Sequence, residues 1–220
     1  MATSTPRTEG AVLSYLGLRR AVGTIGIALP FVLVVGDLAF GGDGLRDSIS
    51  SYYHSPVRDV FVGSMCAVGI FLYCYRYDRP DRLLANVTGT AAIAVALLPT
   101  RPETGATIAE VVVGWLHLVA AAVFFVGLAV FCLDLFTRGE VRNPRKAARN
   151  RVYRICGWTI IACLVLAGLD AAFMPDALSA RWNTLFWLEA VAILAFGVAW
   201  FVKGDTVLRD RPPSDPAPAS

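Results

Sequence analysis

The sequence predicts an all-α, polytopic membrane protein with six transmembrane helices and with both termini in the cytoplasm. Three observations support this class. Hydrophobic residues make up 56% of the 220-residue chain, and only 17% of its residues are charged, whereas about a quarter is usual for soluble domains. The charged residues gather between six long apolar runs. Lysine and arginine are also distributed very unequally between the connecting segments.

The six apolar runs give the predicted spans. A helix that crosses a bilayer needs about 20 mostly apolar residues. The third run is short and the fourth is long, so we expect these helices to tilt. We assign residues 1–18 to a cytoplasmic N-terminal segment, residues 19–204 to the transmembrane domain, and the Pro-rich polar residues 205–220 to a disordered cytoplasmic tail. The predicted spans are residues 20–40, 57–75, 83–99, 108–136, 154–173 and 182–202.

The basic residues predict the orientation of these spans, because cytoplasmic loops are enriched in lysine and arginine. With the N-terminus inside, sixteen of the twenty Lys and Arg residues are cytoplasmic. The four on the outer side are Arg46, Arg58, Arg101 and Arg181. We therefore expect a multi-pass protein of the cell membrane, and specifically of a bacterial inner membrane.

The expected partners follow from the same charges. The segment from Arg138 to Arg154 carries seven cations, which fix the topology and could also hold anionic lipids of the inner leaflet. The net charge of +3 is small, and the chain has neither a glycine-rich phosphate loop nor a stripe of basic and aromatic residues. We expect contact with the lipid bilayer and no binding of nucleic acid.

Ionisable side chains within the spans are the main functional signal. Each costs about 2.5–3.5 kcal/mol at mid-membrane on insertion scales, so each suggests a function by default. Asp134 lies near an inner end and can reach the cytoplasmic interface, and the other acids and His117 fall in the outer half of the predicted bundle, with His54 just outside it. We predict a polar cavity that opens to the extracytoplasmic side. Its expected ligand-binding residues are Asp37, His54, Asp59, His117, Asp170 and Glu189.

Helical spacing places several of these residues on shared faces. Glu110, Gly114 and His117 recur at positions i, i+4 and i+7 of the fourth run, so they lie on one face. Small residues on the first run, Gly23 and Gly26, predict a close approach between helices.

Each polar residue also has a structural interpretation. Asp37 and Asp59 lie near helix ends, where water can solvate them, and Asp59 is in a first turn, where the helix dipole favours a carboxylate. His117 could be a neutral histidine that forms a hydrogen bond between helices.

A second signal is the spacing of Ser50, His54 and Asp59. If residues 50–54 are helical, Ser50 and His54 face the same way one turn apart. This set suggests nucleophilic catalysis with His54 as the base, or a metal-bound water held by His54, His117 and a carboxylate. The sequence contains no HxxxH, HExxH or CxxC pattern. We therefore predict no metal site, and the cofactor stays open.

Two resemblances add to this reading. Ser50, His54 and Asp59 resemble the first part of the motif set of the alkaline ceramidase and progestin-adipoQ receptor superfamily, which are intramembrane hydrolases. Their later histidine pair has no counterpart here, where Glu189 stands instead. Over residues 20–204 the chain resembles a bacterial family of six-helix membrane proteins, which is classed as a domain of unknown function. That resemblance rests on SSYYH at 50–54, RDVFVG at 58–63, ALLPT at 96–100, RNRVYR at 149–154 and FWLE at 186–189.

The leading functional hypothesis from the sequence is a protein that binds or moves a lipid headgroup or a small polar solute through the outer cavity. One alternative is an intramembrane hydrolase that acts on a lipid. The other is a structural scaffold whose polar residues only hold the helices together.

Overall fold

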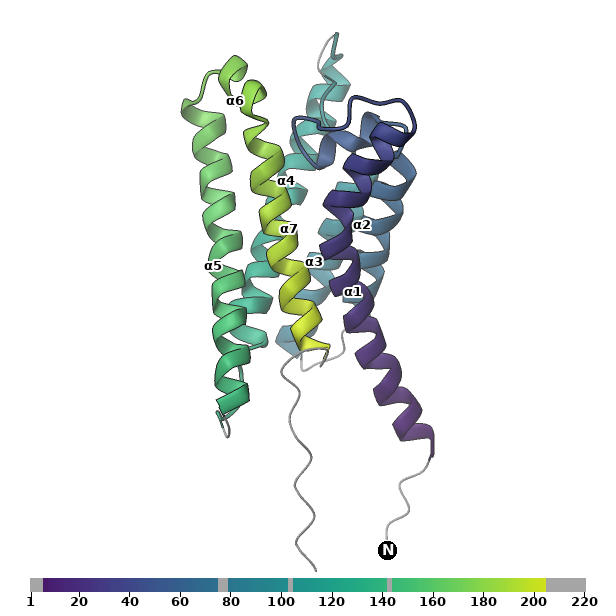
Figure 1. Cartoon of the computed structure of the whole chain (residues 1–220), viewed down its shortest axis with the longest axis vertical. Coiled ribbons are helices and arrows are strands. Elements are labelled where there is room, and N and C mark those ends of the chain that lie inside the picture. The colour runs from purple at the N-terminus through teal and green to yellow at the C-terminus, as the bar shows by residue number, and fades with distance from the viewer. Residues whose placement is uncertain (1–5, 75–78, 103–104, 142–143, 205–220) are drawn as a thin grey trace, which may run out of the picture.

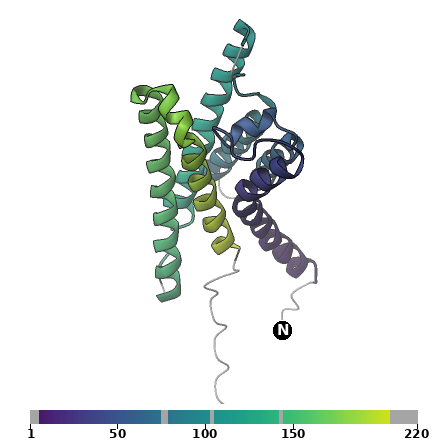
Figure 2. The same cartoon turned by 45° about the horizontal axis from the view of Figure 1, so that its top comes forward.

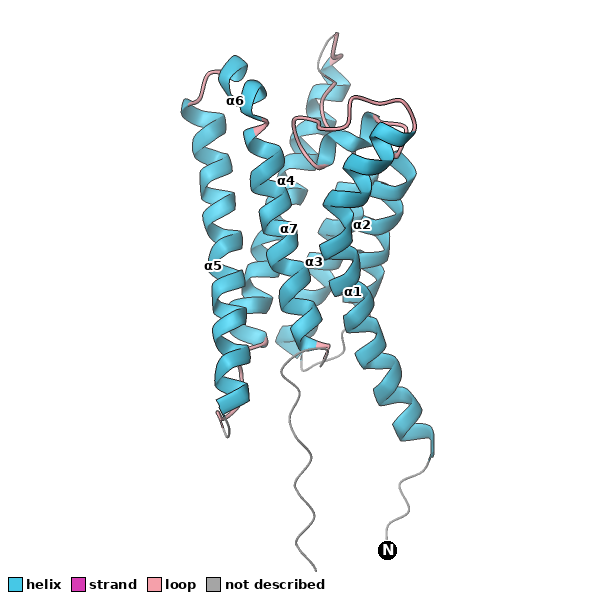
Figure 3. Cartoon of the chain, viewed as in Figure 1, coloured by secondary structure: helices cyan, strands magenta, loops and turns pink. Residues whose placement is uncertain are grey.

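The structure is a computed structural model, and it describes residues 6–74, 79–102, 105–141 and 144–204. The predicted tail at residues 205–220 lies outside these ranges. Every regular element in the described residues is a helix, and none is a strand (Figure 3). The prediction of an all-α protein is confirmed.

The long helices stand side by side in one bundle, and short helices lie at its upper end (Figure 1). We call this upper end the η1 end, and the opposite end, where Arg138 and Lys203 lie, the basic end. The elements in chain order are α1 (Pro6–Ala39), the 3₁₀ helix η1 (Ser50–His54), α2 (Arg58–Tyr73), α3 (Arg79–Leu97), α4 (Ile108–Val130), the π turn η2 (Phe131–Leu135), α5 (Pro144–Phe173), α6 (Asp176–Trp182) and α7 (Thr184–Lys203).

Four segments in the described residues are long and apolar enough to cross a membrane: Leu16–Ala39, Ile108–Leu135, Pro144–Phe173 and Thr184–Lys203. This identifies a membrane protein, and several crossings are plausible by length and composition. The remaining two long helices fall short for different reasons. The 16 residues of α2 extend about 24 Å at 1.5 Å per residue, less than the hydrocarbon core of about 30 Å. The first turn of α3 carries Arg79, Asp81 and Arg82.

Three boundaries differ from the sequence prediction. Helix α5 begins at Pro144, ten residues before the predicted start, so most of the basic segment is helical and not a loop. Proline is well placed in a first turn, and the lysine, arginine and alanine that follow are good helix formers. Helix α1 likewise begins at Pro6, and its N-terminal part extends beyond the bundle (Figures 1 and 2). The predicted short loop before the last span contains α6.

Glycines let α1 and α7 pack with their backbones close together. A Cβ atom built on Gly26 would lie 2.8 Å from the Cα of Gly197, and one on Gly23 would lie 2.7 Å from the backbone nitrogen of Phe201. No larger residue fits there without moving a helix. The predicted close approach along this face of the first span is confirmed.

Aromatic rings fill the core at the basic end. Trp200 is fully buried, and its ring centroid lies 4.5 Å from that of Phe136 and 5.1 Å from that of Phe131. Phe136 also contacts Tyr153 at 5.3 Å between centroids. This cluster ties α5 and α7 to the turn that follows α4.

Candidate functional site

Glu189 connects α7 to the short helix η1. Its Oε2 accepts a hydrogen bond from the backbone N–H of Ser50, at 3.2 Å between the two atoms. Ser50 is the first residue of η1 and is itself buried. A carboxylate within a candidate span therefore holds the short helix η1 against the bundle.

Asp37 holds the loop that leads into η1. It is fully buried, and its Oδ2 accepts a hydrogen bond from the N–H of Gly44 at 2.9 Å. Its Oδ1 lies 3.4 Å from Nη2 of Arg46 in an ion pair. Both carboxylate oxygens are thus occupied by residues of this loop, which explains why a charged group can be buried at this position.

Tyr52 completes the packing of η1. Its ring is fully buried, and its hydroxyl donates a hydrogen bond to the backbone carbonyl of Gly44. Burial raises the pKa of the Tyr52 phenol above its ordinary value, and the nearby Asp37 carboxylate raises it further. Arg46 lowers this pKa and so opposes part of the shift. The Cζ atom of its guanidinium group lies 5.8 Å from the centroid of the Tyr52 ring.

His54 and Asp59 lie on the surface of the η1 end. Both side chains are exposed. A ring nitrogen of His54, Nε2, lies 2.9 Å from the carbonyl oxygen of Thr100. Because η1 is a 3₁₀ helix with three residues per turn, Ser50 and His54 do not share a face. The sequence expectation that they point the same way depended on α-helical geometry, and it is wrong.

His117 occupies a buried position on α4. Its exposed fraction is 4%, and Nδ1 lies 2.7 Å from the carbonyl oxygen of Leu98. In the described part of the chain, Nε2 has no hydrogen-bond partner and is shielded from solvent. His117 and His54 therefore hold carbonyl groups only two residues apart, on the segment that leaves α3.

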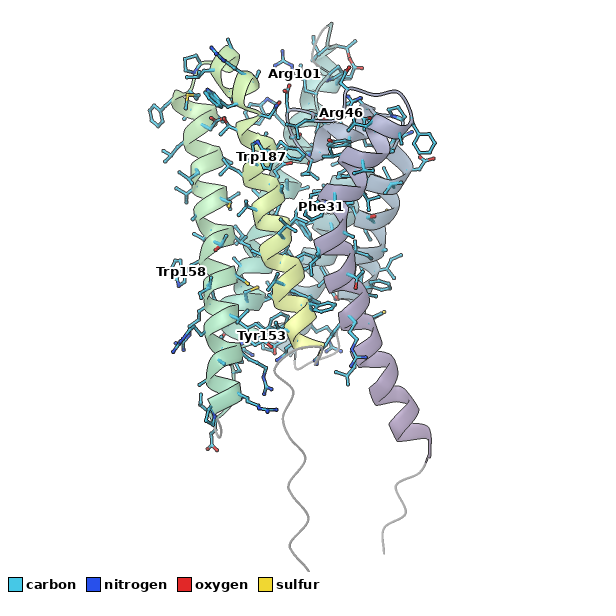
Figure 4. The ribbon with its side chains drawn as sticks, viewed as in Figure 1. Phe31, Arg46, Arg101, Tyr153, Trp158 and Trp187 are labelled. Atoms are coloured by element: carbon cyan, nitrogen blue, oxygen red, sulfur yellow. The ribbon has the colours of Figure 1, made fainter. Side chains whose placement is uncertain are left out.

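These contacts link three of the predicted site residues through the backbone. Glu189 holds the start of η1, His54 joins its end to Thr100, and His117 holds Leu98. Figure 4 shows this crowded end of the molecule, where Arg46 and Arg101 are labelled. The three residues contact segments that lie close together. Neither histidine, however, lines either of the two cavities described next.

An apolar cavity of about 70 Å³ lies between α4, α5 and α7, and Glu189 is its one ionisable carboxylate. Leu118, Ala121 and Phe125 come from α4, Cys163 and Ala167 from α5, and Leu185 and Leu188 from α7. An ionisable side chain within a membrane helix is by default a functional-site hypothesis.

A larger and more polar cavity, of about 300 Å³, lies at the η1 end between α5, α6 and the loop before η1. Asp47 and Asp170 line it together with Ser179. The Ser179 hydroxyl donates to Oδ2 of Asp170 at 2.6 Å, while Oδ1 is buried and has no hydrogen-bond partner within the described residues. Leu185 lines both cavities, so they adjoin.

The sequence did not single out Asp47, Ser179 or Leu185. Asp47 lies in a loop, where an acid is unremarkable without coordinates. Ser179 could have been found only from its distance of nine residues to Asp170 across a turn. Among the described residues, no three His, Cys, Asp or Glu side chains gather in an arrangement that could hold a metal ion.

No family model matches the chain, and no curated protein or solved structure matches it either.

Proposed function

We propose that the protein spans the membrane six times, with both termini in the cytoplasm, and that it binds an amphiphile from the extracytoplasmic side. Helices α2 and α3 supply the two additional crossings by packing between α1 and α4. The distribution of lysine and arginine supports this orientation. In this orientation the η1 end is outside. The proposed membership of the bacterial six-helix family is consistent with this topology.

The observation that carries the proposal is the pairing of two adjoining cavities of opposite character. The apolar cavity at Glu189 suits a slender hydrocarbon group, and the larger cavity at Asp47 and Asp170 suits a polar head. The buried Asp170 Oδ1 needs a hydrogen-bond donor, because a buried unpaired carboxylate oxygen is costly. A lipid headgroup with an amine or hydroxyl group would supply that donor.

A filled cavity tests this function. In Ala167→Leu, a larger side chain enters the apolar cavity from α5. The matched control is Ala172→Leu, an exposed position five residues further along the same helix. Each full-length variant is purified in mild detergent, and the lipids that it retains are identified by mass spectrometry. We expect Ala167→Leu to lose a lipid that the wild type and the control retain. Equal retention by all three proteins would rule out this binding site.

The topology has its own test. A fluorescent protein fused to the C-terminus should fold and fluoresce, because it stays in the cytoplasm, and alkaline phosphatase at the same position should be inactive. Active phosphatase at the C-terminus would show that the orientation is inverted.

A structural scaffold is the second candidate, and one observation favours it. Asp37, His117 and Glu189 each form a hydrogen bond with the backbone of another segment. A scaffold predicts that purified protein retains no specific lipid, and that variants at these positions lower stability without any effect on binding. The lipid analysis above separates the two functions.

A further inference from the structure

The basic end of the molecule contains a cavity of a different kind. Its volume is about 120 Å³, and none of its described lining residues is acidic. Three helices and the loop before α5 contribute cations to it. The five cationic side chains are Arg19 of α1, Arg138 of that loop, Lys146 and Arg149 of α5, and Lys203 of α7; Phe136, Asn150 and Tyr153 complete the lining.

Aromatic rings fix the position of one of these charges. The ammonium nitrogen of Lys203 lies 5.1 Å from the ring centroid of Phe136 and 5.7 Å from that of Tyr153. Both rings are buried in the aromatic cluster, and cation–π attraction holds an ammonium group at such distances. Figure 4 labels Tyr153 near this end of the bundle.

Hydrogen bonds to carbonyl groups hold further cations in place. Nη1 of Arg19 lies 3.4 Å from the carbonyl oxygen of Lys203, and Nε of Arg20 lies 2.9 Å from that of Gly204. These arginines cap the C-terminal end of α7, where positive charge is favourable. Nζ of Lys146 donates to the carbonyl oxygen of Arg138 at 2.9 Å. Hydrogen bonds within the fold therefore fix the positions of these cations.

Arg138 is paired with two acidic side chains. Arg138 donates to both oxygens of Asp81, at 2.8 and 2.9 Å, and also to Asp134. The hydrogen bonds with Asp134 and Asp81 raise the pKa of Arg138. The lining cations Arg19, Lys146, Arg149 and Lys203 are half-buried and face a common cavity. A cleft lined by charges of one sign raises the local concentration of ions of the opposite sign, so this cavity favours an anion.

We propose that this cavity binds the phosphate group of an anionic phospholipid from the adjacent leaflet. The inference rests on the proposed cytoplasmic position of this end. A neighbouring groove of about 560 Å³ favours a lipid over free phosphate, since it shares Asn150 with the cavity and continues along Ile155 and Trp158. Trp158 is 63% exposed, as expected for an aromatic residue at a membrane interface, and an acyl chain can lie against it.

Two arginines at the basic end provide a matched test. Arg149 lines the cavity, whereas Arg82 of α3 is exposed and lines neither the cavity nor the neighbouring groove. Full-length Arg149→Gln and Arg82→Gln lose the same charge. Native mass spectrometry of each variant, with equal amounts of phosphatidylglycerol and phosphatidylcholine in the micelles, counts the lipids bound. Should Arg149→Gln fail to fold, Lys146→Gln replaces it.

The wild type should retain phosphatidylglycerol in preference to phosphatidylcholine. Arg149→Gln should weaken that retention about five-fold, the effect of one lost cation near an anionic lipid, and Arg82→Gln should weaken it by much less. Equal losses of retention in the two variants would show that diffuse surface charge, and not this cavity, holds the lipid, and would overturn the proposal. Full displacement of phosphatidylglycerol by millimolar inorganic phosphate would identify free phosphate as the ligand and overturn the lipid assignment. A negative result here leaves the lipid retained through Ala167 unaffected, so the two proposals fail separately.

Discussion

Glu189 and Ser50 are 139 residues apart in the chain, yet the backbone N–H of Ser50 donates a hydrogen bond to the Glu189 carboxylate. This contact fixes η1 over the cavity between α4, α5 and α7. It gives the carboxylate a structural role in addition to the proposed binding role. The structural role needs an acceptor oxygen at position 189 but no negative charge. Replacing the carboxylate with a neutral acceptor therefore tests this role separately.

The first prediction concerns that acceptor. Glu189→Leu leaves the buried Ser50 amide without a partner, and we expect unfolding to become easier by about 1–3 kcal/mol. Glu189→Gln keeps an acceptor oxygen and should lose less. Thermal unfolding of the purified variants in detergent measures both effects. If Glu189→Leu melts at the wild-type temperature, the contact contributes nothing to the fold.

The second prediction compares the two histidines. His117 is buried and holds the Leu98 carbonyl, so His117→Phe should destabilise the protein by about 1–3 kcal/mol. His54 is exposed, and His54→Ala should change stability by no more than about 0.5 kcal/mol, as is usual for surface positions. The same unfolding assay applies. An equal loss in both variants would contradict the difference in burial.

The third prediction is a dependence on alkaline pH. Burial raises the pKa of Tyr52, whereas the phenol of an unfolded chain ionises near pH 10. Because the folded-state pKa is the higher one, the stability linked to Tyr52 is fully present below the unfolded pKa. It is lost as the pH rises through the folded pKa. Tyr52→Phe should remove this part of the alkaline destabilisation. Unfolding temperatures between pH 9 and pH 11.5 measure the difference, and identical profiles for the wild type and Tyr52→Phe would refute it.

The all-α class could be predicted from the sequence because hydropathy is a local property. Long apolar runs such as that of α7 leave few alternatives, and its predicted start at residue 182 lies close to the observed Thr184. Basic segments misled the prediction, because Arg145 to Arg154 continue the helix of α5 into the polar zone. Composition alone marks the apolar part of such a helix and not its end.

The candidate site was harder to predict, since it depends on which segments meet. The sequence identified Glu189 and Asp170 as unusual, and both line cavities. It gave no indication that Asp37 would hold a neighbouring loop, because the partner is the backbone N–H of Gly44. Backbone donors are present at every position except proline, so a sequence does not reveal which of them a buried carboxylate will contact.

The last prediction tests the packing of α1 on α7. A methyl group at Gly26 would lie 2.8 Å from the Cα of Gly197 and 2.9 Å from the ring of Phe196. Neither helix can yield easily, because both contacts lie in the packed core, and Gly26→Ala should cost about 1–3 kcal/mol of stability. The control is Gly168→Ala on α5, where nothing lies within 4 Å of the added atom. There the higher helix propensity of alanine should stabilise the protein by up to about 1 kcal/mol. Opposite shifts in unfolding temperature are therefore expected, and a stabilising effect of Gly26→Ala would show that the two helices are further apart than described.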